Sequence, residues 1–165
     1  AFLMNYILGG GGFGSRLYSE IREKRGLAYS VSTYLHPMQL SALISGSAGT
    51  KNERVAESLN LVKSEWSRMR SDGVTMEELE RAKSYLTGSF PLRLSSTNAI
   101  ARMLVFIQYH DLGIDYIDKR ASYINAVSRD RIAKLARKLL DPDKLIFVVV
   151  GKPKDVQATA RAPQF

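Results

Sequence analysis

The stretch Leu27–Ala48 (LAYSVSTYLHPMQLSALISGSA) decides the fold class of this chain. Its first part, Leu27–Leu35, is rich in alternating β-branched and aromatic residues, and the alternation puts Tyr29 on the face of Leu27 and the other odd-numbered residues. After turn residues 36–39, the alternation resumes over Leu40–Ala48. Two alternating runs with a short link predict an antiparallel hairpin.

The hairpin is followed by segments with helical periodicity. Helices are expected over residues 50 to about 71, 75–88, 95–112, 114–125 and 128–140. The first two open on the capping-box patterns Thr50–Glu53 and Thr75–Glu78, in which a hydroxyl and a carboxylate satisfy the unpaired amides of a first turn. Ser128 is expected to cap the last of these helices.

The segment ahead of the hairpin is harder to assign. Ala1–Leu8 is apolar but too short for its periodicity to separate helix from strand. The glycines of Gly9–Gly12 and Gly14 are expected to interrupt the chain before a helix over Ser15–Lys24, which Gly26 stops. With no basic stretch before it, the apolar start is a poor signal peptide and resembles an element entered partway through.

The end of the chain completes the expected domain. Leu145–Val150 (LIFVVV) predicts a buried strand closed by Gly151, and residues 152–165 are expected to form a polar tail. The order of elements predicts one α+β domain over residues 1–151, with a mainly antiparallel sheet covered on one face by several helices. Three strands make a thin sheet, so further strands are expected ahead of Ala1.

Composition excludes several kinds of site. The 165 residues contain no cysteine, which removes disulfides, thiolate nucleophiles and iron–sulfur clusters. No apolar run approaches the roughly 20 residues that span a bilayer, so no membrane span is expected. The net charge of +8 makes nucleic acid, an anionic membrane surface or an acidic partner possible ligands.

Metal and nucleotide sites find little support. His36 and His110 lie far apart in the chain and lack the spacing of a helical zinc pair, so no metal ligands are assigned. Gly9, Gly11 and Gly14 satisfy G-x-G-x-x-G, but the following strand ends without the acidic residue that would bind a ribose. We interpret the glycine run as a flexible connection, or as a loop that another backbone can approach closely.

Two basic segments have ordinary explanations as well. The five basic residues of 129–138 spread around their helix without interleaved aromatics, which favours a solvated face over a nucleic-acid site. By periodicity alone, Arg22 is a cation at a helix end and Tyr29 is a strand aromatic.

The wider string adds a more specific interpretation. Leu8–Tyr29 (LGGGGFGSRLYSEIREKRGLAY) resembles the non-catalytic half of zinc peptidases related to pitrilysin, insulin-degrading enzyme and mitochondrial processing peptidase. The resemblance continues through Thr50–Glu53, Thr75–Lys83, Gly88–Arg93, Asp141–Asp143 and Val148–Gly151. Together these motifs cover nearly the whole chain.

The resemblance implies a clam shell of two related α+β halves, one of which carries the zinc motif H-x-x-E-H. This chain lacks that motif, so it resembles the other half: it is expected to be inactive alone, with zinc on the partner half. In active relatives, an arginine and a tyrosine seven positions later reach across to the substrate. Arg22 and Tyr29 match; Arg22 would donate to substrate carbonyls and Tyr29 to the developing oxyanion.

The same resemblance implies further roles. Gly9, Gly10, Gly11 and Gly12 resemble, in shortened form, the glycine-rich loop of the processing peptidase's non-catalytic subunit, which handles substrate. The implied partners are a zinc-bearing half and an unfolded peptide, with a homodimer as a possible form of the isolated chain, and the implied compartment is a bacterial periplasm or cell envelope. Two alternatives stay open: a structural relative like the respiratory-complex core subunits, and a basic nucleic-acid-binding module.

Overall fold

The predicted hairpin is present in the computed structural model of the chain, which describes residues 1–38 and 40–160. Strands β1 (Ala28–Pro37) and β2 (Ala42–Thr50) pair antiparallel, with Val31 opposite Ala48 and Pro37 opposite Ala42. They form a two-stranded sheet. The hairpin follows from the alternating apolar pattern that the sequence carries on both sides of the turn.

Helices make up most of the remaining structure. The α-helices are α1 (Phe2–Asn5), α2 (Val55–Asp72), α3 (Met76–Gly88), α4 (Thr97–Tyr109), α5 (Tyr116–Asn125) and α6 (Arg129–Leu139). Two π-helical turns, Tyr6–Gly10 and Tyr18–Glu23, and a 3₁₀ turn, Gly12–Gly14, lie between α1 and β1. Further 3₁₀ turns are Asn52–Arg54, Phe90–Leu94 and Pro142–Lys144. None of the helices within the described residues is both long and apolar enough to cross a bilayer.

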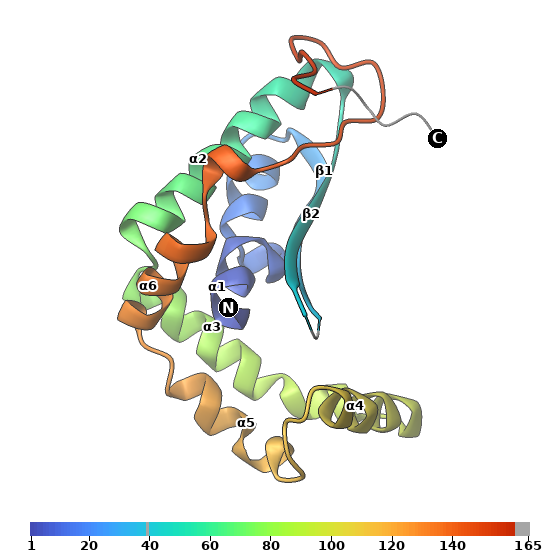
Figure 1. Ribbon diagram of the computed structural model, residues 1–165, viewed down its shortest axis with the longest axis vertical. Helices are drawn as coiled ribbons and strands as arrows, with labels where there is room; N and C mark the ends of the chain where they lie inside the picture. Colours follow the sequence, from blue (N-terminus) through green and yellow to red (C-terminus); the bar gives the residue numbers. More distant parts are fainter. Residues whose placement is uncertain (39, 161–165) are drawn as a thin grey trace.

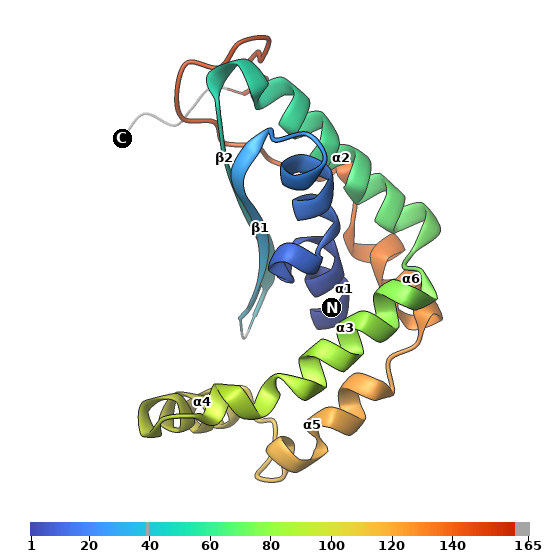
Figure 2. The same ribbon diagram turned by 180° about the vertical axis from the view of Figure 1, so that it is seen from behind.

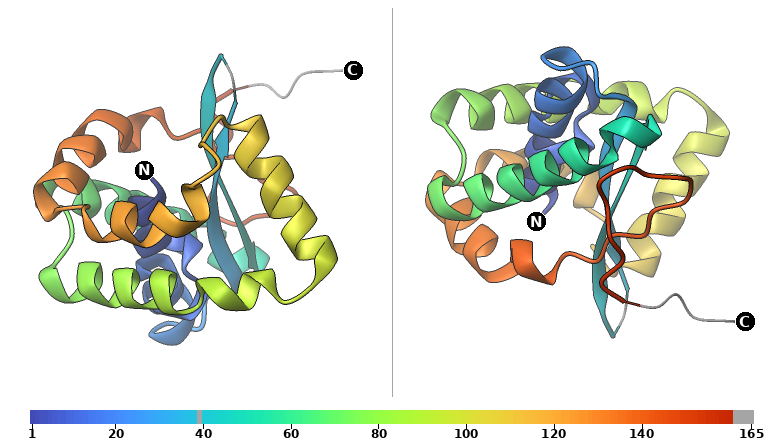
Figure 3. Two further views of the ribbon diagram at one scale, coloured as in Figure 1. Left: turned by 90° about the horizontal axis from the view of Figure 1, so that it is seen from below. Right: turned by 90° about the horizontal axis from the view of Figure 1, so that it is seen from above.

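The elements are arranged in layers (Figures 1 and 2). The N-terminal helical turns lie against one face of the hairpin, and α2, α3, α5 and α6 form an arc outside them. Helix α4 leaves the end of this arc and projects past the hairpin toward its other side (Figure 3). The molecule is therefore α+β, with an antiparallel sheet covered on one face by several helices, as the sequence predicts, while α4 lies beyond that face (Figure 3).

The core lies between the hairpin and the outer helices. Its most buried side chains come from the N-terminal turns, α2, α3 and the end of α6, and include Met4, Leu8, Leu17, Ile21, Met69, Leu79, Leu86 and Leu140. Because the N-terminal turns contribute half of these side chains, they form the central layer on which both the sheet and the outer helices pack. The residues between Gly9 and Tyr29 are thereby held on a rigid base.

Helix starts follow the sequence at two sites and depart from it at a third. Thr75 forms the predicted capping box with Glu78, and the Ser128 hydroxyl accepts from the Arg131 amide. The predicted capping box at Thr50 is wrong, because Thr50 is the last residue of β2 and its hydroxyl donates to the Leu27 carbonyl at 2.6 Å. That contact ties the two strand ends together and leaves α2 to begin later.

The predicted strand over Leu145–Val150 is also absent: this segment forms no ladder with β1 or β2. Ile146 and Val150 are more than nine-tenths exposed. The apolar composition is that of a buried strand, but the segment pairs with neither open edge of the two-stranded sheet, so most of its side chains stay exposed. The sheet accordingly has two strands instead of the three expected. After Gly151, the backbone amides of Lys152 and Lys154 donate to Asn52. Residues 161–165 of the expected tail lie outside the described part of the chain.

Candidate functional site

The structure brings Arg22 and Tyr29 together, with the Arg22 guanidinium 5.3 Å from the centre of the Tyr29 ring. The turn between them explains their spacing. Gly26 has a φ of 61°, and the amides of Gly26 and Leu27 donate to the carbonyls of Arg22 and Ile21. This glycine C-cap ends the π-helical turn and sends the chain back along the sheet, so that a helix-end residue and a strand-start residue become neighbours.

Tyr29 is displayed by an irregularity in the sheet. Ala28 lies opposite Thr50 and Ser30 opposite Gly49, so Tyr29 is the extra residue of a β-bulge. The simple alternation predicted that Tyr29 would share a face with Val31. Val31 is buried, whereas the side chain of Tyr29 is 83% exposed. The prediction was wrong because a bulge shifts the alternation and re-aims the side chain, an arrangement common beside functional sites.

The Arg22 guanidinium has aromatic neighbours on two sides. It lies 5.1 Å from the centre of the Tyr18 ring as well as near Tyr29. Cation–π contacts of this kind contribute about 0.5–1 kcal/mol at exposed positions. Within residues 1–38 and 40–160, no hydrogen bond or ion pair occupies the guanidinium, so its N–H donors are available to an incoming carbonyl or carboxylate.

The glycine run divides into a packing part and an exposed part. A Cβ on Gly9 would lie 2.6 Å from Thr33 Oγ1, and one on Gly11 would lie 2.7 Å from the Tyr6 carbonyl oxygen. Gly9 and Gly10 continue the helix, contrary to the predicted break, because the missing side chains allow this turn to pack against β1. Gly12 is exposed and has a φ of 56°, with open space around it.

A cavity of about 450 Å³ lies between the glycine run and α3. Its walls include Tyr6 and Tyr85, whose rings stack with centres 5.8 Å apart, and it carries the charged side chains Glu78, Arg81 and Arg93. No pattern in the sequence marks these tyrosines or arginines as site residues. Arg81 and Arg93 do stand inside the strings Thr75–Lys83 and Gly88–Arg93, but nothing in those strings shows that they meet.

Aromatic contacts connect the cavity with the Arg22–Tyr29 pair. Phe13 lines the cavity and packs edge-on against Tyr18, with ring centres 4.8 Å apart. Tyr18 in turn lies under Arg22. Tyr18 is buried, so this connection runs beneath the surface, while Phe13 at one end and Tyr29 at the other are exposed.

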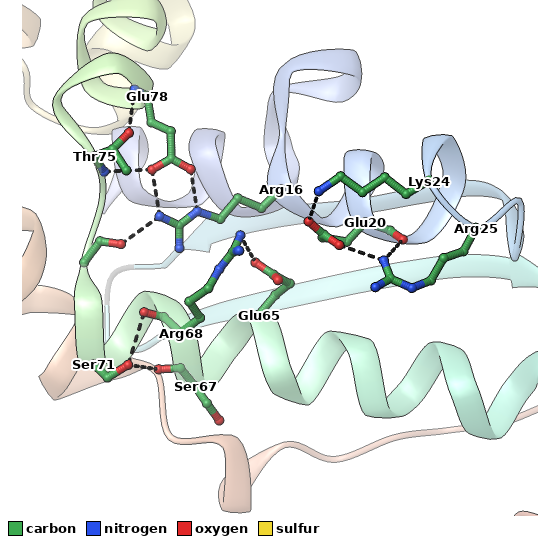
Figure 4. A network of polar contacts seen from close by, with 11 residues as sticks. Arg16, Glu20, Lys24, Arg25, Glu65, Ser67, Arg68, Ser71, Thr75 and Glu78 are labelled. Carbon is green, nitrogen blue, oxygen red and sulfur yellow. Dashed lines mark hydrogen bonds and ion pairs between the residues drawn. The ribbon is translucent and has the colours of Figure 1, made fainter.

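A buried ion pair holds the glycine run against α3 (Figure 4). Arg16 donates to both carboxylate oxygens of Glu78, at 2.6 and 2.7 Å, and to the Gly73 carbonyl at 2.8 Å. Burial by itself would raise the pKa of Glu78, but the hydrogen bonds from Arg16 and Thr75 outweigh it and hold that pKa below its ordinary value. Glu78 is therefore ionised at neutral pH and its charge is matched by Arg16.

Potential metal ligands do not gather within the described residues. No group of three or more His, Cys, Asp and Glu side chains that could hold a metal ion occurs there. His36 contacts the Ser45 hydroxyl at 2.7 Å on the hairpin surface, and His110 packs against the rings of Phe106 and Tyr109. Both histidines therefore contact side chains that lie close to them in the chain or across the hairpin.

Comparisons with known proteins identify the family of this chain. Residues 1–86, slightly more than half of the chain, match the family model described as the peptidase M16 inactive domain. A Bacillus subtilis protein described as uncharacterized zinc protease YmxG is 29% identical over 151 residues, covering 89% of this chain and 36% of that protein. Helicobacter pylori has a relative described as non-peptidase homolog YmxG, which is 31% identical over 152 residues, 92% of this chain and 35% of the relative.

A solved structure shows the same fold. The peptidase M16 inactive domain from Pseudomonas fluorescens superposes with a TM-score of 0.76 at 34% identity, covering 86% of this chain and 34% of that one. The chain therefore spans about a third of the length of the relatives described here. By sequence and by fold, it belongs to the peptidase M16 inactive domain family.

Proposed function

We propose that this chain binds an extended, unfolded peptide as the zinc-free part of a bipartite metallopeptidase. In this proposal Arg22 donates to a backbone carbonyl of the peptide and Tyr29 donates its hydroxyl to the oxyanion that develops during cleavage. The reacting carbonyl would be held at a zinc ion on the catalytic half, since the present chain supplies no H-x-x-E-H motif. Family membership supports the non-catalytic assignment.

One observation carries the proposal: the contact between Arg22 and an outward-facing Tyr29. Tyr29 is displayed at a bulge, and its 83% exposure leaves the hydroxyl able to reach a ligand. The guanidinium lies 5.3 Å from its ring, and its N–H groups are unoccupied within residues 1–38 and 40–160. A cation and a hydroxyl donor held side by side suit a peptide carbonyl that gains negative charge.

The direct test is cleavage of a quenched, unstructured peptide by the zinc-bearing half, with and without this chain. We expect hydrolysis only when both are present. Tyr29→Phe removes the hydroxyl and keeps the ring, so it is expected to lower the rate by about 100-fold or more, the usual loss for one oxyanion donor. Arg22→Ala is expected to weaken peptide binding.

Tyr34→Phe is the matched control, because Tyr34 is an exposed tyrosine of the same strand that lies away from Arg22. Its rate should equal that of the unchanged chain. The proposal fails if the mixture is inactive, or if Tyr29→Phe and Arg22→Ala both leave cleavage and binding unchanged. Thermal melts of each variant separate loss of function from loss of folding.

A structural role without cleavage is the second candidate. The Helicobacter pylori relative is described as a non-peptidase homolog, and a chain of that kind would keep the fold and its partner while handling no peptide. This candidate predicts stable assembly with the partner half and no effect of Tyr29→Phe on any activity of the complex. We further propose a bacterial cell-envelope location, which fractionation of cells carrying the tagged protein would test.

A further inference from the structure

The cavity beside the glycine run carries an unbalanced positive charge. Glu78 is its one acidic lining residue among the described residues, and both oxygens of that carboxylate already accept from Arg16. Arg81 and Arg93 have no acidic partner within residues 1–38 and 40–160. The cavity therefore presents two guanidinium groups whose charge the surrounding protein leaves uncompensated.

The rest of the lining is aromatic and apolar. Tyr6 and Tyr85 stack along one wall, and Phe13 closes the side toward Arg22. Burial raises the pKa of Tyr6 and the nearby Tyr85 raises it further, whereas Arg81 and Arg93 lower it. The two arginines thus act on the same phenol, which stays protonated and able to donate at neutral pH.

We propose that this cavity binds a carboxylate group of the peptide, held by Arg81 and Arg93, with the stacked rings of Tyr6 and Tyr85 against its apolar stem. Guanidinium groups pair with carboxylates through parallel, charge-assisted hydrogen bonds, and aromatic walls suit the methylene groups of a side chain. This inference rests on the proposed function, because it names the peptide chemistry that the same surface selects.

The position of the cavity supports a link with the Arg22–Tyr29 pair. Phe13 and Tyr18 form a continuous aromatic contact from the cavity to Arg22. The exposed side chains at its two ends, Phe13 and Tyr29, would contact an extended peptide that also reaches the cavity. The carboxylate would then lie several residues from the scissile bond, where it affects selection of the peptide and not the chemical step.

The test compares three fluorescent peptides of otherwise identical, unstructured sequence. The first has one internal Glu and an amidated C-terminus; the second has Gln in its place and is also amidated; the third has Gln and a free C-terminal carboxylate. We expect the first or the third to bind at least tenfold tighter than the second, because charge-assisted hydrogen bonds between guanidinium and carboxylate are stronger than those to a neutral amide. Tighter binding of the first peptide identifies the carboxylate as a side chain, and tighter binding of the third identifies it as the C-terminus.

The same peptides are then measured with Arg81→Ala and Arg93→Ala. Each substitution is expected to remove most of the gain and to leave binding of the amidated Gln peptide unchanged. Arg102→Ala is the control, because Arg102 is an exposed arginine of α4 that does not line the cavity. Equal binding of all three peptides, or a gain that survives both cavity substitutions, would overturn the proposal.

A second measurement is independent of peptide binding. N-acetylglutamate amide is titrated against the chain while the arginine Nε–H resonances are followed by NMR. The resonances of Arg81 and Arg93 are those that disappear in Arg81→Ala and Arg93→Ala. If these resonances shift saturably, the cavity proposal is supported even when no peptide binds, and the proposed function alone then fails. Peptide binding through Arg22 without such shifts means that the cavity proposal alone fails.

Discussion

Glu65 is a single residue with an unfavourable environment that its neighbours only partly correct. Its carboxylate is 6% exposed on the inner side of α2 and pairs with Arg68 at 2.7 Å (Figure 4). Burial raises its pKa above the ordinary value, and Arg68 and Arg16 counteract this only in part. The folded protein therefore holds a proton on Glu65 more tightly than the unfolded chain does, and the ionised carboxylate costs stability at neutral pH.

Glu65→Gln is expected to raise the melting temperature at pH 7, because an amide of the same shape removes the buried charge. The sign follows from the raised pKa of Glu65. The stability that its protonated carboxyl contributes is fully present below the pKa of the unfolded chain, and it is lost as the pH rises through the higher pKa of the folded protein. The gain should therefore shrink as the pH is lowered toward 4. Melting curves from pH 4 to 8 measure it.

Glu57→Gln serves as the control, since Glu57 is an exposed acid of the same helix in a surface pair with Arg54. Its melting temperature should differ little from that of the parent at any pH. A Glu65→Gln variant that is less stable than the parent at pH 7 would contradict the argument, because it would mean that the ion pair with Arg68 outweighs the burial cost.

The glycine run shows what one element gains from residues without side chains. The π-helical turn Tyr6–Gly10 packs on β1 at a distance that only a missing Cβ permits, since a Cβ on Gly9 would approach Thr33 Oγ1 to 2.6 Å. The same contact places Asn5 Nδ2 within 3.2 Å of the Thr33 carbonyl. The turn, the strand and the cavity wall beyond them are therefore coupled through one close approach.

Gly9→Ala is expected to destabilise the fold by about 1–3 kcal/mol, the usual cost of overpacking a close contact. Gly14→Ala is the matched control, because no atom lies within 4 Å of a Cβ there and its φ is not positive. Urea unfolding of both variants measures the difference. Adding Thr33→Ala, which removes the two closest atoms, should restore part of the loss; equal stability of the two glycine variants would refute the packing role.

At the scale of the whole molecule, much apolar surface lies open. Helix α4 exposes Leu104, Val105 and Phe106 by 54%, 64% and 44%, and the segment Leu145–Val150 is extended and largely exposed. Exposed apolar surface of this kind is typical of an interaction face. The chain spans about a third of the length of the relatives described above.

The isolated chain is accordingly expected to self-associate through α4. Leu104→Lys should shift a dimer to a monomer in size-exclusion chromatography with light scattering, because a charge on that face cannot be buried without a partner. Leu40→Lys, at a fully exposed position before β2, should leave the dimer intact. A monomeric parent chain, or a dimer that survives Leu104→Lys, would exclude this face.

Several features of the fold were predictable because their causes are local. The hairpin follows from alternation over a few residues, the Thr75 capping box from two side chains three residues apart, and the later helices from their apolar period. The motif that pairs Arg22 with Tyr29 also lies within one short string, Leu8–Tyr29. Such signals survive in the sequence since they involve neighbours along the chain.

What only the tertiary structure decided depends on residues far apart in the chain. Thr50 contacts Leu27 instead of capping a helix, the bulge turns Tyr29 outward, and Arg16 neutralises Glu78 from 62 positions away. The cavity with Arg81 and Arg93 exists only because the glycine run packs beside α3. Burial, pairing and charge balance are properties of positions in space, and only the packed chain brings these groups within contact distance.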